Sequence, residues 1–187
     1  MMRIITGKAR GIRLETLEGE ATRPTSERAK EALFSMIQFE LEGREVLDLF
    51  GGSGQLGLEA LSRGALHATI CDRSKQAVSV ITKNAEKTKL APDCRIICAD
   101  WEEVLRRYER RAKFDIVFLD PPYAERLILK VLPKLLPMLK PTSIVVCESA
   151  EPDVFAKSGM EEKFETVKSA KYGIAYINIL KLKGEEQ

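Results

Sequence analysis

Short apolar runs alternate with longer segments of helical periodicity over residues 45–148, and this alternation most constrains the fold. The apolar runs lack the polar–apolar alternation of half-exposed strands, which is typical of strands covered by helices on both faces of a parallel sheet. The pattern therefore predicts a doubly wound α/β domain. The predicted strands are 45–50, 67–71, 94–98, 114–119 and 143–148. The predicted helices are 55–63, 74–88, 101–108 and 125–139, the last broken near Pro133 and Pro137.

The amino-terminal part does not follow this alternation. Residues 3–6 and 12–16 are strand-like and are separated by a short stretch that begins and ends with glycine. Two such segments around a turn predict a β-hairpin. We therefore divide the chain into an N-terminal β-hairpin arm, residues 1–22, and a main domain, residues 23–187.

The carboxyl-terminal part is again rich in strand-forming residues. Residues 163–169 and 174–182 are strand-like, and the predicted turn between them is 170–173. We expect this pair to close the sheet as an antiparallel hairpin. Together with the five strands of the alternating region, it gives a mostly parallel seven-stranded sheet.

The composition indicates a globular cytoplasmic protein without a metal centre. Of the 187 residues, 44% are apolar and 31% are charged, which suits one compact domain. No apolar run reaches the length of a membrane span, so no membrane partner is expected. The four cysteines form no Cys-x-x-Cys pair and His67 is the single histidine, so we expect buried, reduced thiols and no metal site.

A glycine-rich loop follows the first predicted strand of the alternating region, in the sequence DLFGGSGQLG of residues 48–57. Gly52 and Gly54 allow the backbone to approach a ligand closely, and the following helix presents unpaired N–H groups. The spacing also matches the dinucleotide fingerprint, so the loop alone predicts only a nucleotide-like cofactor. Phe50 could flank that cofactor or pack beneath the loop.

Acidic side chains follow the predicted strands at the edge where ligands bind in open α/β sheets. Asp72 is expected to accept the ribose hydroxyls of an adenosine-containing cofactor, and Asp100 is expected to accept from the adenine amino group. Trp101 could cover the adenine ring or belong to the core. Asp48 could hold the amino-acid end of a methyl donor and would repel a pyrophosphate, which favours S-adenosylmethionine over NAD.

The tetrapeptide Asp-Pro-Pro-Tyr, residues 120–123, follows the predicted strand 114–119 and is the most informative stretch. An exocyclic base amine is a poor nucleophile because its lone pair is delocalised into the ring. The Asp120 carboxylate and the Pro121 carbonyl can accept its two N–H groups and favour a tetrahedral nitrogen, while Tyr123 can stack on an extruded base. We predict methyl transfer to a planar amine, catalysed mainly by alignment.

The chain resembles the bacterial RsmD-type 16S rRNA guanine-N2 methyltransferases. The resemblance rests on the glycine loop and its following helix, on Asp120 to Tyr123, on an amino-terminal match around Arg10 and on the final hairpin. It implies a class I, Rossmann-like methyltransferase fold and S-adenosyl-L-methionine as cofactor. It also implies that the substrate is a guanine of 16S rRNA, in the small ribosomal subunit or its assembly intermediate.

Two positions depart from the family pattern. Gly51 replaces a common alanine and is expected to loosen the loop slightly, and Asp72 replaces a glutamate that is one methylene longer. The net charge of +2 does not by itself indicate nucleic-acid binding, but basic residues gather at the amino terminus. The resemblance makes four of them candidates for binding RNA phosphates or guiding the base: Arg10, Arg13, Arg23 and Arg28.

Several other functions are compatible with parts of this pattern. An adenine-N6 methyltransferase acting on DNA or RNA would use the same acceptor geometry, and it is the main alternative. A protein glutamine methyltransferase usually begins its tetrapeptide with asparagine. An NAD-dependent oxidoreductase would leave the tetrapeptide without a role, and a non-catalytic RNA-binding module would not need the cofactor loop. Nothing in the sequence indicates an obligate dimer, so a monomer is expected.

Overall fold

Seven strands form one sheet in the order β3-β2-β1-β4-β5-β7-β6. The computed structural model describes residues 2–17, 27–109, 113–121, 127–150, 152 and 159–184. Strands β1 to β5 pair in parallel, and β7 is antiparallel to both β5 and β6. The predicted doubly wound, mostly parallel α/β sheet is therefore confirmed. Its strands are β1 (Glu45–Asp48), β2 (His67–Asp72), β3 (Cys94–Cys98), β4 (Phe114–Leu119), β5 (Leu139–Ser149), β6 (Phe164–Tyr172) and β7 (Ala175–Leu182).

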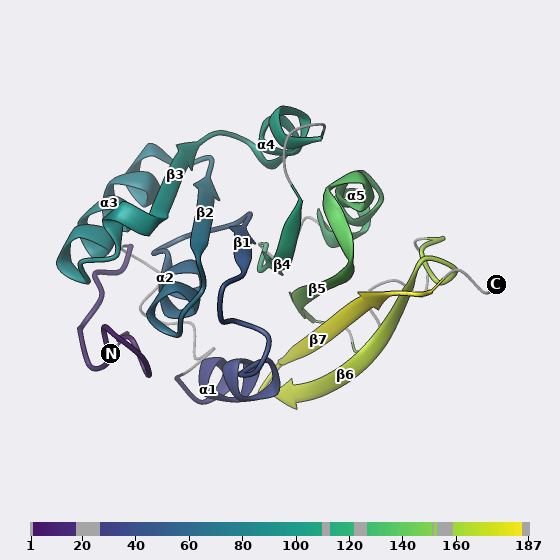
Figure 1. Ribbon diagram of the computed structural model, residues 1–187, viewed down its shortest axis with the longest axis horizontal. Coiled ribbons are helices and arrows are strands. Elements are labelled where there is room, and N and C mark those ends of the chain that lie inside the picture. The colour runs from purple at the N-terminus through teal and green to yellow at the C-terminus, as the bar shows by residue number, and fades with distance from the viewer. Residues whose placement is uncertain are drawn as a thin grey trace.

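Helices cover both faces of this sheet, with α4 and α5 on one side and α1 and α2 on the other (Figure 1). One hydrophobic core joins α1, α2 and α3 to the sheet through side chains such as Leu33, Leu58 and Ile81. The other joins α4 and α5 through Val104 and Leu132. The helices are α1 (Glu27–Met36), α2 (Gln55–Ser62), α3 (Lys75–Lys87), α4 (Trp101–Tyr108) and α5 (Leu127–Leu135).

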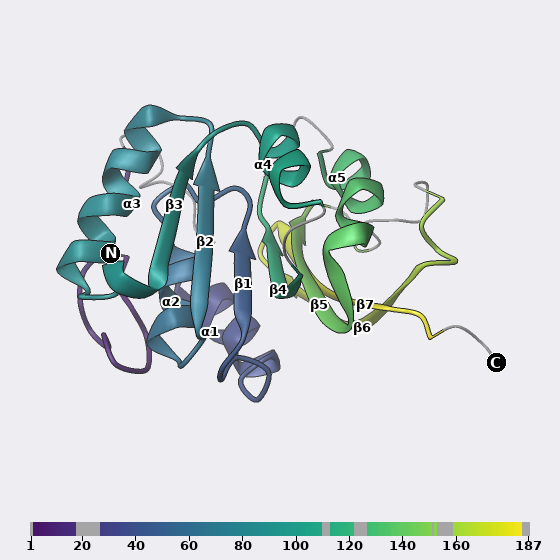
Figure 2. The ribbon, with the colours of Figure 1, turned by 45° about the horizontal axis from the view of Figure 1, so that its top comes forward.

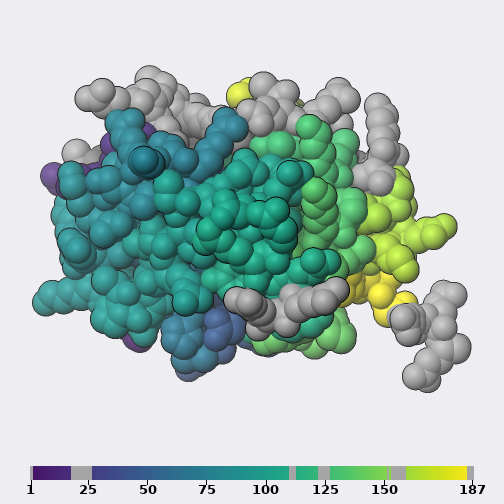
Figure 3. All heavy atoms as spheres, turned by 90° about the horizontal axis from the view of Figure 1, so that it is seen from above, coloured from purple at the N-terminus to yellow at the C-terminus, as the bar shows by residue number. Residues whose placement is uncertain are grey.

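Helices α4 and α5 lie next to each other on the face seen from above (Figure 3). The Lys134 amine of α5 is 2.7 Å from the Glu102 carboxylate of α4. The break expected near Pro137 is confirmed, because α5 ends at Leu135 and the chain continues as a 3-10 turn, η4 (Leu136–Met138), whereas the break expected near Pro133 is wrong, because Pro133 lies inside α5. Pro137 has no N–H to extend the helix, and β5 begins directly after this turn.

The amino-terminal residues form a shorter hairpin than predicted. The described part contains one antiparallel bridge, Arg3 to Arg13, and ladder bonds such as Ile4 N to Ile12 O at 3.0 Å. The N–H groups of Ile5 and Thr6 bond to a side chain of α2 instead of to the opposite strand, which limits the ladder. Figure 2 shows this segment beside α2 and α3. The expected boundary between residues 22 and 23 lies outside the described residues.

The final hairpin turns later than predicted. Strand β6 runs to Tyr172, which pairs with Ala175, so Gly173 and Ile174 form a two-residue turn in place of the predicted 170–173. Gly173 has φ of +62°, and a positive φ at the first central residue suits a tight hairpin connection. The ladder therefore extends to the last residue before the glycine.

Candidate cofactor and acceptor site

The glycine loop connects the carboxyl end of β1 to the amino terminus of α2. Gly54 is the N-cap of α2 with φ of +79°, and it makes no side-chain cap. Gly52 also has a positive φ, +55°, which residues other than glycine rarely adopt. The Gly51 N–H donates to Cys71 O at 2.7 Å, which ties the loop to β2. The loop thus has the conformation that the sequence predicts for close approach of a ligand.

Gly51 does not loosen this loop, contrary to the expectation from its replacing alanine. A Cβ atom at Gly51 would lie 2.6 Å from Ile70 Cγ2 and 3.1 Å from Ile81 Cδ1. The space that an alanine methyl group would need is therefore filled by Ile70. The sequence at position 51 alone could not reveal this close packing, because Ile70, which fills the space, belongs to the next strand.

Asp48 is fully buried at the end of β1, beneath the loop. Its Oδ2 accepts from Gly57 N at 3.0 Å, and its Oδ1 has no hydrogen-bond partner in the part of the chain that the structure describes. The pKa of Asp48 is raised to about 7, mainly by burial; the charge of Asp72 contributes to the rise, whereas the backbone N–H groups of Gly57 and Phe50 oppose it. A buried carboxylate oxygen that lacks a partner fits the amino group of a methyl donor.

Asp72 lies at the end of β2 and is already bonded to the loop. Its Oδ2 accepts from Gly52 N at 2.9 Å, and its Oδ1 accepts from Ser74 N at 2.8 Å. A carboxylate can accept about four hydrogen bonds, so these two contacts leave room for ribose hydroxyls. The shorter aspartate therefore orders the glycine loop as well as standing at the predicted ribose position.

Asp100 and Trp101 begin α4 but differ in exposure. Asp100 is exposed and is the N-cap of the helix, with Glu102 N donating to its Oδ1 at 3.0 Å. Trp101 is only 9% exposed, belongs to the core, and has the Lys134 amine 5.1 Å from the centre of its ring. This favours the core alternative for Trp101, and its stacking on adenine stays a prediction. Phe50 is half-buried and packs against the same core.

Asp120 and Pro121 follow β4 directly, at the same edge of the sheet as the glycine loop. Asp48 pairs with Phe118, so Asp120 lies two residues beyond the end of β1 in the neighbouring strand. Asp120 is half-buried and Pro121 is buried. Tyr123 lies outside the described residues, so its stacking role stays a prediction.

The four candidate RNA-binding arginines are placed unevenly. Arg10, Arg13 and Arg28 are exposed, and Arg23 lies outside the described residues. The hairpin tip beside Arg10 contacts Ser62, with Lys8 N donating to Ser62 O at 2.8 Å. Ser62 is eight residues beyond Gly54, or about 12 Å along α2. This placement does not support Arg10 as a guide for the base, and its contact with RNA phosphates stays a prediction.

The structure also identifies a residue that the sequence reasoning missed. Asn84 is fully buried on α3, on the same face as Ala77 and Ile81. A polar residue on an apolar helix face is a signal that the sequence contains. Its partners could not be inferred, because they lie 31 and 69 residues away.

Among the described residues, the cysteines and the acidic side chains offer no reactive thiol pair and no metal site. Cys71 and Cys147 are buried, and burial raises the pKa of both thiols, so they are poor nucleophiles. Cys98 is exposed, contrary to the expectation of burial. Among the described residues, no group of three or more His, Cys, Asp and Glu side chains could hold a metal ion. None of the described helices is long and apolar enough to cross a membrane.

Comparison with known proteins gives the family. Residues 2–181 match the family model described as Conserved hypothetical protein 95. The chain belongs to this family. YlbH of Bacillus subtilis, named as a candidate rRNA methyltransferase, is 39% identical over 132 residues, which are 70% of this chain and 72% of that protein. The ribosomal RNA small subunit methyltransferase D of Haemophilus influenzae is 35% identical over 151 residues, 79% of this chain and 78% of that protein.

A solved structure confirms the architecture over almost the whole chain. The Escherichia coli protein yhhF, described as a candidate methyltransferase, has a TM-score of 0.83 at 28% identity. The match covers 98% of this chain and 99% of that chain. The RsmD-type resemblance and the class I methyltransferase fold predicted from the sequence are therefore confirmed.

Proposed function

We propose that this protein transfers a methyl group from S-adenosyl-L-methionine to the exocyclic N2 amine of a guanine in 16S rRNA of the small ribosomal subunit. One observation carries the proposal: the glycine loop, the buried Asp48 and the Asp-Pro pair after β4 share one edge of the sheet. The small-subunit rRNA methyltransferases of the same family support the substrate class.

In this proposal the cofactor contributes an activated methyl group, and the chain supplies binding and alignment. Asp48 holds the amino group of the cofactor, Gly52 and Gly54 allow close approach, and Asp72 and Asp100 accept from ribose and adenine. Asp48 fits this role because its Oδ1 is buried and lacks a partner among the described residues. Trp101 and Phe50 border the same edge.

The acceptor side uses residues that follow β4. The Asp120 carboxylate and the Pro121 carbonyl oxygen accept the two N–H groups of guanine N2, which turns its lone pair toward the methyl group. Tyr123 stacks on the extruded base. The amine loses one proton after transfer, and Asp120 is the carboxylate that we assign to accept it. No covalent intermediate with the protein is needed.

Arginines bind the RNA backbone in this account. Arg10, Arg13, Arg23 and Arg28 contact phosphates, with Arg10 doing so at the end of α2 opposite the glycine loop. We further propose that the protein acts as a monomer on the small subunit or its assembly intermediate, in the cytoplasm where subunits assemble. The arm, residues 1–22, and the methyltransferase domain, residues 23–187, act together on this substrate.

Transfer of labelled methyl groups tests the proposal. Small subunits that lack the modification are incubated with the protein and labelled S-adenosylmethionine, and RNA and protein fractions are separated. We expect label in 16S rRNA with the wild type and none with Asp120→Ala. Label in ribosomal protein would support the glutamine alternative and contradict the proposal. Titration calorimetry should show binding of S-adenosylhomocysteine; binding of NAD alone would contradict the cofactor assignment.

A further inference from the structure

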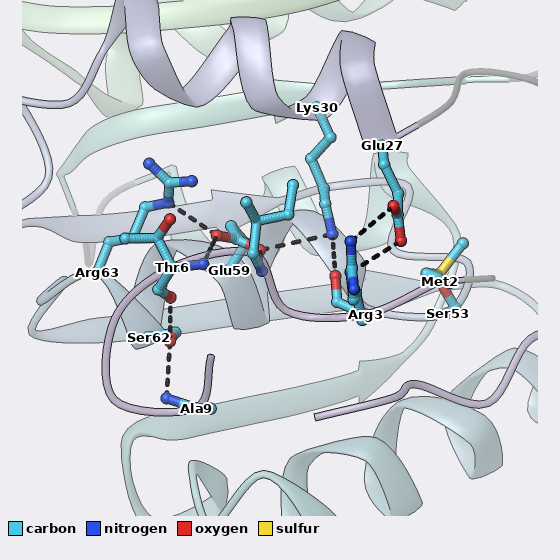
Figure 4. Close-up of polar contacts among 11 residues, drawn as sticks. Met2, Arg3, Thr6, Ala9, Glu27, Lys30, Ser53, Glu59, Ser62 and Arg63 are labelled. Carbon is cyan, nitrogen blue, oxygen red and sulfur yellow. Dashed lines mark hydrogen bonds and ion pairs between the residues drawn. The ribbon is translucent and has the colours of Figure 1, made fainter. Parts of the chain in front are cut away.

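The amino-terminal segment, residues 2–16, is clamped to the carboxyl-terminal half of α2 (Figure 4). Glu59 is fully buried and accepts from Ile5 N at 2.8 Å and from Thr6 N at 3.0 Å. Ser62 Oγ donates to Thr6 O at 2.6 Å and accepts from Ala9 N at 3.0 Å. The turn of the hairpin is therefore fixed to α2 through buried polar contacts.

A buried charge cluster reinforces this clamp. The Lys30 amine donates to Arg3 O at 2.6 Å and lies 3.5 Å from Glu59 Oε2, while Arg63 Nε donates to Glu59 Oε1 at 2.8 Å. Burial lowers the pKa of Lys30, and the negative charge of Glu59 opposes this shift. Breaking a buried pair on one side is costly, so the cluster holds the segment in one position on α1 and α2.

The carboxyl-terminal end of the segment is joined to the glycine loop by Asn84. Its Oδ1 accepts from Glu15 N at 2.8 Å, and its Nδ2 donates to Glu15 O at 3.0 Å and to Ser53 O at 2.9 Å. Both amide hydrogens and the amide oxygen are thus used. Turning the amide over would set its NH₂ against the Glu15 N–H and its oxygen against two carbonyls, so the orientation is fixed.

A second contact joins the same two regions. Ser53 Oγ donates to Met2 Sδ at 3.0 Å. Ser53 is buried and lies between Gly52 and Gly54, the two loop residues with positive φ. The position of the loop and the position of the amino-terminal segment therefore depend on each other.

We propose that Asn84 is a positioning residue that couples occupancy of the cofactor loop to order in the amino-terminal segment. The inference rests on the proposed function, in which the loop binds S-adenosylmethionine. A ligand that fixes the loop also fixes the Ser53 carbonyl, which holds the Asn84 amide and through it the backbone of Glu15. Because coupling between two binding events is reciprocal, nucleic acid bound along the segment tightens the binding of the cofactor.

Hydrogen exchange at the Glu15 amide tests this coupling, with S-adenosylhomocysteine as the probe. In the wild-type protein, saturating probe should slow exchange of the Glu15 N–H several-fold. In Asn84→Ala, exchange at Glu15 should be faster and should not respond to the probe. The dissociation constant of the probe should rise about tenfold, as expected for the loss of buried hydrogen bonds.

Thr88→Val is the matched control. Thr88 is buried on the same helix, and its hydroxyl donates within α3, to Asn84 O at 2.7 Å and to Ala85 O at 3.1 Å. This variant loses buried hydrogen bonds while the contacts of the Asn84 amide remain. We expect it to keep both the affinity for the probe and the response of Glu15.

Three results would separately contradict the coupling, the role of Asn84 and the proposed function. Binding of the probe to the wild type without slower exchange at Glu15 would overturn the coupling, and this measurement needs no variant. A response at Glu15 that persists in Asn84→Ala would overturn the assignment to Asn84. Failure of the wild type to bind the probe at all would instead overturn the proposed function.

Discussion

Replacing Asp48 should change how the stability of this protein depends on pH. Burial raises the pKa of Asp48 from 3.8 to about 7, so the folded chain keeps a proton that the unfolded chain releases between these values. The contribution of this group to the free energy of unfolding is therefore full below about pH 4 and falls as the pH rises to about 7. A rise of roughly three pKa units corresponds to about 4 kcal/mol. The amide of Asp48→Asn does not titrate, so the stability of this variant does not fall with pH for this reason.

Urea denaturation at pH 4.5 and pH 8 measures the effect. The difference in unfolding free energy between Asp48→Asn and the wild type should shift by about 3 kcal/mol in favour of the variant at the higher pH. Taking the difference cancels the carboxylates that both proteins share. Glu86→Gln, on the exposed face of α3, is the control for loss of a surface charge.

The same group should connect stability to cofactor binding. An ammonium group beside Asp48 Oδ1 favours the carboxylate, so binding of S-adenosylhomocysteine should release a proton and strengthen as the pH rises through 7. Asp48→Asn should bind the ligand weakly at every pH. A stability difference that is equal at pH 4.5 and pH 8 would refute the reasoning about burial.

Three further perturbations follow from the geometry. Lys30→Met should lower the free energy of unfolding by about 1–3 kcal/mol in urea denaturation, because Arg3 O loses its buried donor and Glu59 keeps only Arg63 as a charged partner; an unchanged stability would contradict this. Gly51→Ala should lower the free energy of unfolding by about 1–3 kcal/mol because the new Cβ meets Ile70, and the same change should cost less in an Ile70→Ala background, where the clash is relieved. An equal cost in both backgrounds would contradict the packing argument. Arg10→Gln should weaken rRNA binding and lower the salt dependence by about one phosphate contact, measured by filter binding, while the affinity for S-adenosylhomocysteine without RNA stays unchanged.

Elements with clear boundaries in the sequence were predicted to the residue. The predicted segments 94–98, 101–108 and 114–119 coincide with β3, α4 and β4. Asp100 shows why: it is the N-cap of α4 and lies only two residues after the end of β3, so both boundaries are marked in the sequence. The common location of the acidic candidate residues could be predicted for a related reason, because the carboxyl ends of parallel strands share one edge of the sheet.

Features that depend on distant partners could not be predicted. The hairpin of residues 2–16 was expected to form longer strands, but Glu59 takes the N–H groups of Ile5 and Thr6 from a position more than 50 residues away. The tight fit of Gly51 depends on Ile70 of the next strand. Periodicity places Trp101 on a helix but does not say which face of that helix meets the core.

The identity of the methylated nucleoside distinguishes guanine N2 from the other possible acceptors. Small subunits that lack the modification are treated with the protein and S-adenosylmethionine, and the 16S rRNA is digested and analysed by mass spectrometry. We predict N2-methylguanosine with the wild-type protein and its absence with Asp120→Ala. That variant should bind S-adenosylhomocysteine within about threefold of the wild type, because we assign Asp120 to the acceptor amine and not to the cofactor. N6-methyladenosine in place of N2-methylguanosine would contradict the assignment of the acceptor.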